Sequence, residues 1–117
     1  MAVCGLLLSA CAGLQPQNDI LGFSGLGNEI RNFYEQHAVE QNWSCTFPRI
    51  DTILTAQRVE EGAEEQTIRV RYAWRSGGGR IDPGANLCRG TAERDFVIRP
   101  LGDRAVVVAM TGGQRRR

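Results

Sequence analysis

His37 is the single histidine of the chain, and it is the first candidate for acid–base chemistry because imidazole titrates near neutral pH. It shares one face of a predicted helix with Phe33 and Tyr34. The sequence places no serine or free cysteine to act as its nucleophile, and a catalytic triad is recognised by geometry rather than by the presence of a histidine. We therefore expect a packed or half-buried histidine, and we assign no catalytic residue and no cofactor.

A small-molecule site near this histidine remains an alternative. Tyr34, His37, Tyr72 and Trp74 would line it if the predicted helix covers the predicted sheet. Such a pocket would suit a small-molecule binder or an isomerase-like enzyme, provided that an acid or base points inward.

Arginines form a second candidate site. Arg69, Arg71 and Arg75 alternate with apolar residues, so their side chains share the wet face of one strand. Guanidinium groups in such a row could accept a phosphate or a carboxylate. Glu93 and Asp95 fall on the matching face of the next strand if the strands form a meander, so cross-strand ion pairs are the alternative.

No metal site is predicted. Glu60, Glu61, Glu64 and Glu65 form an acidic turn, but their spacing lacks the ligand pattern of a calcium loop. One histidine and isolated cysteines do not make a zinc ligand set.

The elements that must position these residues are one helix and four strands. An apolar stripe at spacings of three and four residues predicts a helix from a cap at Asn28 to about Asn42. Strict alternation predicts a strand with one buried face, and a nearly continuous apolar run near the C-terminus predicts a strand buried on both faces or inside the sheet. The predicted strands are Thr46–Val59, Thr67–Arg75, about Cys88–Arg99 (with Ala92, Phe96 and Ile98 on one face) and Arg104–Thr111. We predict an α+β fold in which one N-terminal helix packs across a four-stranded antiparallel meander.

Composition narrows the function classes. A chain of 117 residues suits a single domain. A net charge of +1 gives no bulk attraction to nucleic acid. No stretch approaches the roughly 20 apolar residues of a spanning helix, so membrane contact would have to go through a lipid.

The run Leu8-Ser9-Ala10-Cys11 resembles the lipobox of bacterial lipoproteins. The resemblance implies cleavage before Cys11, which would carry the lipid, and Ala12 rather than Asp after it implies the outer membrane, facing the periplasm. The expected divisions are a signal peptide (1–10), a tether (11–27), one domain (28–112) and a basic tail (113–117), which could touch anionic headgroups or fray.

The same resemblance assigns the cysteines. With Cys4 in the removed signal and Cys11 acylated, Cys45 and Cys88 remain as an even pair. An oxidising periplasm would join them, although two separate buried thiols are the alternative.

The order of elements resembles the cystatin-like and nuclear-transport-factor-like folds. Within it, Gln57–Gly62 is similar to the Gln-x-Val-x-Gly protease-binding loop of cystatins, which implies a protease inhibitor as one further alternative. The leading expectation is a non-enzymatic lipoprotein that binds another envelope component or has a structural role.

Overall fold

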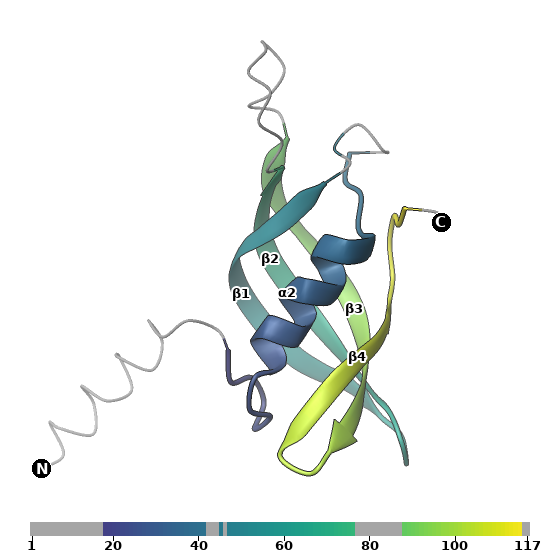
Figure 1. The fold of residues 1–117 in the computed structure, drawn as a ribbon. Helices are drawn as coiled ribbons and strands as arrows, with labels where there is room; N and C mark the ends of the chain where they lie inside the picture. The colour runs from purple at the N-terminus through teal and green to yellow at the C-terminus, as the bar shows by residue number, and fades with distance from the viewer. Residues whose placement is uncertain (1–17, 42–44, 46, 77–87, 116–117) are drawn as a thin grey trace, which may run out of the picture.

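The computed structural model describes residues 18–41, 45, 47–76 and 88–115 (Figure 1). The expected signal peptide, the lipidation site Cys11 and the tether up to residue 17 lie outside the described residues, as do residues 116 and 117 of the expected basic tail. Within the described part, one helix and one antiparallel sheet make an α+β structure. The elements are helix α2 (Leu26–His37) and strands β1 (Pro48–Glu61), β2 (Gln66–Ser76), β3 (Arg89–Leu101) and β4 (Arg104–Met110).

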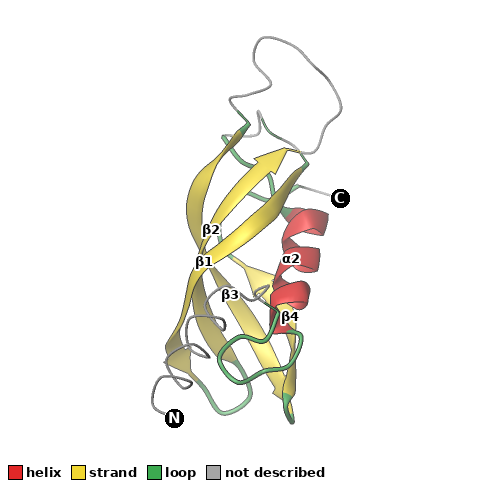
Figure 2. Ribbon diagram, turned by 90° about the vertical axis from the view of Figure 1, so that its left-hand side faces the viewer, coloured by secondary structure: helices red, strands yellow, loops and turns green. Residues whose placement is uncertain are grey.

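The sheet is a meander whose strands lie in the order β1-β2-β3-β4. Every neighbouring pair is antiparallel, and the sheet is strongly twisted (Figure 2). Helix α2 contacts the two edge strands, β1 and β4. The residues that it buries are Leu26, Gly27, Ile30 and Tyr34.

Strand β2 has the alternation that the sequence predicts. Ile68, Val70, Tyr72 and Trp74 are all buried, whereas Arg71, between two of them, and Arg75, directly after Trp74, are exposed. A strand with one apolar face therefore supplies the centre of the core.

Strand β4 differs from its prediction. The apolar run was expected to lie inside the sheet or to be buried on both faces, and this is wrong, because β4 is an edge strand. Ala105 and Met110 are buried, but Val108 is 36% exposed. An apolar run cannot by itself distinguish an interior strand from an edge strand whose second face is partly open.

Helix α2 begins earlier and ends earlier than predicted. Gly25 takes the N-cap position with φ 77°, and Asn18 supplies the acceptors, because its side-chain oxygen accepts the Asn28 N–H at 3.3 Å. The predicted cap at Asn28 is therefore wrong. The helix ends at His37 because Ala38 is already extended, with ψ 150°.

The residues before the helix belong to the folded body. Ile20 and Phe23, within the range expected to be a tether, are buried in the core. The Ser24 N–H donates to the Asp103 carbonyl at 2.7 Å, next to the β3–β4 turn. Residues 18–25 thus fix the start of α2 at that end of the sheet.

Candidate functional site

A buried arginine is the most unusual feature of the core. Arg94 lies on the inner face of β3, in line with Phe96 and Ile98, and is only 5% exposed. Its Nε donates to the Tyr72 hydroxyl at 2.7 Å. Nη1 donates to the carbonyls of Thr111 and Gly113, at 2.8 and 2.9 Å.

The remaining nitrogen of Arg94 completes the set of contacts. Nη2 donates to the Val39 carbonyl at 2.7 Å and lies 3.3 Å from Glu40 Oε2. A guanidinium has five N–H donors; four of them make these hydrogen bonds, and Nη2 also forms the ion pair with Glu40. Arg94 is therefore engaged by the chain itself, and its role is to hold the surrounding segments together.

Glu40 is the counter-charge of this network. Its side chain is 11% exposed, and its Oε2 accepts the hydroxyls of Tyr34 and Tyr72, both at 2.6 Å. No described residue donates to Oε1. Because the described part of the chain contains no fully buried side-chain oxygen or nitrogen without a partner, Oε1 must reach solvent.

Beside Arg94, the C-terminal segment that follows β4 separates from strand β3. Gly112, with φ 91°, follows β4, and a Cβ there would lie 2.7 Å from Arg94 Nη1. Beyond it the chain turns to residues 38–40: the Val39 N–H donates to Gly113 O at 3.1 Å, and Ala38 forms a bridge with Gln114. The C-terminal segment thus leaves β3 and joins the segment that follows α2.

A cleft of about 410 Å³ lies at this separation. It is within the range of roughly 300–1,000 Å³ that is typical of ligand sites. The residues that line it are Val39, Glu40, Gln41, Tyr72, Ala92, Glu93, Arg94, Gly112 and Gly113.

Burial raises the pKa values of both tyrosines well above their usual range. Burial is the largest cause for each, followed by the hydrogen bond to the negatively charged Glu40. A tyrosine that loses its proton here would face a carboxylate. The two phenols therefore stay neutral donors at physiological pH, which is unsuited to base or nucleophile chemistry.

The structure brings together only part of the predicted pocket. The Tyr34 and Tyr72 rings meet edge to face, 5.0 Å between centroids. His37 stacks on Phe33 at 4.1 Å, and its Nδ1 donates to the Phe33 carbonyl at 2.8 Å. Trp74 is buried beside Gly90. Of the four predicted residues, Tyr72 alone lines the cleft.

The predicted arginine row carries two ion pairs. Arg69 binds both oxygens of Asp95, at 2.9 and 3.2 Å, and this pairing raises the Arg69 pKa. Arg75 lies 3.2 Å from Asp51. Arg71 stands opposite Glu93 in the register, with no ion pair to any described residue. Arg69 and Arg75 are thus engaged by carboxylates of the chain itself.

Arg115 closes the C-terminal end of α2. Its guanidinium donates to the carbonyls of Ala38 at 2.8 Å and Glu35 at 2.9 Å, and also to that of Gln36. It lies over the Phe47 ring, 4.8 Å from the centroid. A cation at the negative end of the helix dipole stabilises it, so this residue of the expected basic tail is part of the folded body.

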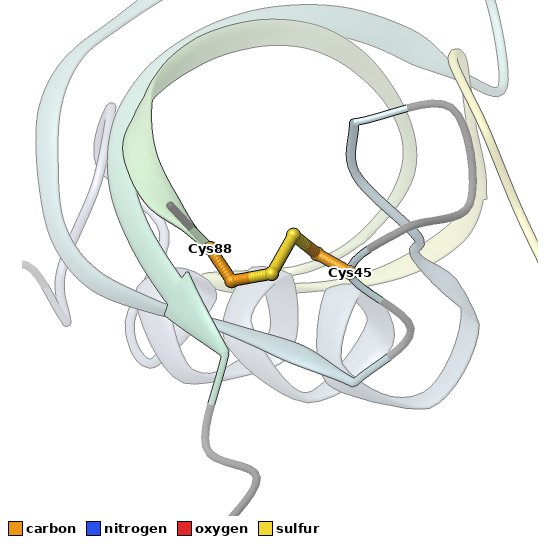
Figure 3. Close-up of a disulfide and its surroundings, with 2 residues drawn as sticks. All are labelled: Cys45 and Cys88. Carbon is orange, nitrogen blue, oxygen red and sulfur yellow. A yellow bond between two sulfur atoms is a disulfide. The ribbon is translucent and has the colours of Figure 1, made fainter. Parts of the chain in front are cut away.

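Cys45 and Cys88 form the predicted disulfide (Figure 3). Their Cα atoms are 5.6 Å apart, and Cys45 is buried. Glu40 and Cys45 exchange backbone hydrogen bonds, at 2.9 and 3.1 Å. The bond therefore attaches the segment that carries Glu40 to the start of β3.

The described residues limit two other kinds of site. No group of three His, Cys, Asp or Glu side chains among them is arranged to hold a metal ion. No helix in the described part of the chain is long and apolar enough to cross a membrane.

Comparison with known proteins adds no family. The chain matches no family model, and neither a curated protein nor a solved structure is significantly similar to it.

The sequence analysis did not predict the buried pair of Arg94 and Glu40. The signal for Arg94 was present, because it occupies the position between Ala92 and Phe96 on a face that alternation assigns to the core. An arginine there requires a buried acceptor. Glu40 carried no such signal, since a longer helix would have turned it toward solvent.

Proposed function

We propose that this protein is a small, non-enzymatic lipoprotein of the bacterial envelope. In this proposal, residues 1–10 are removed, Cys11 carries the lipid, and the folded body faces the periplasm from the outer membrane. The helix is the first element of that body and lies across the meander. Its role is to bind another envelope protein.

The disulfide is the observation that carries the proposal. A bond between Cys45 and Cys88 fits an oxidising compartment, because reducing systems keep cytosolic thiols free. It also leaves Cys11 available for acylation.

The chemistry of the core supports a binding role over catalysis. Arg94 makes four hydrogen bonds and an ion pair within the chain itself, and the two tyrosines that contact Glu40 stay protonated. The alternative of a ligand pocket or an isomerase-like site near His37 gains no support, because that ring stacks on Phe33 away from the cleft lining. The protease-inhibitor alternative gains none either, because Gln57–Glu61 is part of strand β1 and not a loop.

Metabolic labelling with a palmitate analogue tests the anchor. The wild type should be labelled and should fractionate with outer membranes. Cys11→Ala should lose the label, whereas the matched control Cys4→Ala should keep it. Unlabelled wild-type protein, or label that persists in Cys11→Ala, would refute lipidation at this residue.

A further inference from the structure

Strand β3 has an edge that no described strand covers. On one side β2 pairs with β3 from Arg89 to Ile98. On the other side β4 pairs only from Phe96 to Leu101. The stretch Arg89–Arg94 therefore has one partner strand in the described structure, and Figure 1 shows the C-terminal segment leaving this part of the sheet.

The backbone groups of this stretch point toward the cleft. Asp95 exchanges hydrogen bonds with Thr111: its carbonyl accepts the Thr111 N–H at 2.9 Å, and its N–H donates to Thr111 Oγ1, also at 2.9 Å. Asp95 thus directs both groups away from β2. Directions alternate along an antiparallel strand, and the β2–β3 register has no break, so Thr91 and Glu93 direct theirs the same way.

No described residue pairs with these backbone groups of Thr91 and Glu93. Ala92, Glu93 and Arg94 form one wall of the cleft, and Val39–Gln41 with Gly112 and Gly113 form the other. Unpaired N–H and C=O groups on a strand edge are the template for adding another strand.

The charge of the cleft indicates which strand would fit. Arg94 and Glu40 neutralise each other through Oε2, while no described residue donates to Glu40 Oε1. Glu93 alternates with the inward-facing Arg94 along β3, so its side chain stands on the opposite face of the sheet. Oε1 of Glu40 is therefore the open acceptor of the cleft. A cation that enters the cleft gains a partly buried carboxylate oxygen.

We propose that the open edge of β3 binds an extended segment of a partner protein by strand addition, with a lysine or arginine of that segment at Glu40 Oε1. Main-chain hydrogen bonds to Thr91 and Glu93 supply affinity, and the basic residue supplies selection. This inference names the binding surface of the proposed function. It rests on the binding role only and not on the lipid anchor.

The free edge of strand β1 is a poorer template. Strand β1 is interrupted by three register shifts, after Ile50, after Ile53 and after Arg58. Such bulges are one way in which proteins blunt a sheet edge.

The experiment uses the full chain, purified in detergent, against a phage-displayed library of random short peptides. The enriched peptides should alternate β-branched residues with others and carry lysine or arginine. Bound peptide should slow hydrogen exchange at the Thr91 and Glu93 amides. Replacing the basic residue of the peptide by methionine should weaken binding about tenfold.

Two variants separate the backbone from the side chain. Glu93→Pro removes the N–H that faces the cleft without removing a bond to β2, and should weaken binding at least about tenfold. Glu93→Ala keeps that N–H and should change affinity less than about threefold. Thr91→Pro repeats the test if Glu93→Pro fails to fold.

Four results would overturn the proposal. The first two are no enrichment over the Glu93→Pro protein and equal binding by Glu93→Pro and Glu93→Ala. The third is exchange protection on β1 or β4 instead of β3. The fourth is protection of Thr91 and Glu93 that grows with protein concentration alone. The last would identify a second copy as the occupant. Because no membrane is used, failure here leaves the palmitate test of the anchor unaffected.

Discussion

Arg94 Nη2 lies 3.3 Å from Glu40 Oε2 in the interior of the domain, and the same guanidinium binds the carbonyls of Val39, Thr111 and Gly113. One side chain of β3 therefore connects three separate parts of the chain. Buried charge is costly unless it is paired and hydrogen-bonded, and both conditions are met here. We therefore expect the packing of residues 39–40 and 111–113 against β3 to depend on Arg94.

Arg94→Met should be strongly destabilising. It removes the cation and leaves Glu40 buried without a counter-charge, which costs about 3 to 5 kcal/mol in comparable buried pairs. Urea unfolding followed by circular dichroism would measure the loss. The matched control is Arg69→Ala, since the Arg69 side chain is 43% exposed and an exposed pair is worth less than about 1 kcal/mol. Equal losses for the two variants would contradict the assigned role of Arg94.

The disulfide should supply a large share of stability. It joins residues 43 positions apart, and closing a loop of that length stabilises the folded state by about 4 kcal/mol in the chain-entropy model. Replacing both Cys45 and Cys88 by serine should lower the free energy of unfolding by that amount. A reductant should lower the wild type similarly and leave the double variant unchanged. Free thiols at both positions in protein purified without reductant would show that the bond is not formed.

Gly112 should tolerate a side chain less well than Gly102. Both have positive φ, 91° and 69°, but a Cβ at Gly112 meets Arg94 Nη1 at 2.7 Å, and one at Gly102 meets nothing within 4 Å. Gly102→Ala should cost about 1 to 2 kcal/mol from backbone strain alone. Gly112→Ala should cost about 1 to 3 kcal/mol more, because Arg94 must shift.

A double-mutant cycle tests whether the clash with Arg94 causes the extra cost of Gly112→Ala. In an Arg94→Met background, the excess cost of Gly112→Ala over Gly102→Ala should largely disappear, because the group in its way is gone. An unchanged excess would mean that the strain at Gly112 has another source.

Stability should fall steeply in alkali. The pKa values of Tyr34 and Tyr72, the only two tyrosines of the chain, are raised by burial and by Glu40. Above about pH 10 the unfolded chain releases these protons while the folded chain keeps them, so the unfolded state binds fewer protons and stability decreases as pH rises. The stabilisation that comes from the raised pKa values is fully present below about pH 10. Above that pH, each tyrosine lowers the free energy of unfolding by about 1.4 kcal/mol per pH unit.

Unfolding free energies measured between about pH 9 and pH 11.5 would test this slope. Tyr34→Phe removes one titrating group and should reduce the slope by about half. Tyrosinate absorbance that appears near pH 10 in the folded protein would contradict the raised pKa values.

The sequence predicted the elements better than their ends. Period-two alternation identified β2 correctly because its pattern of Ile68 to Trp74 depends only on which face is buried. The start of α2 was misplaced because Asn18 accepts the N–H groups of Gly27 and Asn28 in its first turn. Asn18 is separated from the helix by an irregular segment, and no local pattern reveals this contact. The position of β4 at the edge depends on strand order, which an apolar run does not encode.

The candidate site was predictable only in part. Tyr34 and Tyr72 were rightly placed near each other, since both occupy apolar positions that face the same core. His37 was grouped with them by helical spacing. It lies about one turn after Tyr34, at the end of α2, where its side chain is only half-buried and stacks on Phe33. Glu40 reaches the network only because the chain leaves the helix at Ala38, which is a tertiary event.

The position of α2 determines which end of the domain meets its surroundings. Residues 18–25 enter beside the β3–β4 turn at one end of this helix, and the cleft lies at its other end, beside Val39 and Glu40. Its 12 residues amount to a rod of about 18 Å. A tether that joined the domain through Asn18 would thus attach at the end of α2 opposite the cleft and would leave the unpaired stretch of β3 on the side away from the attachment.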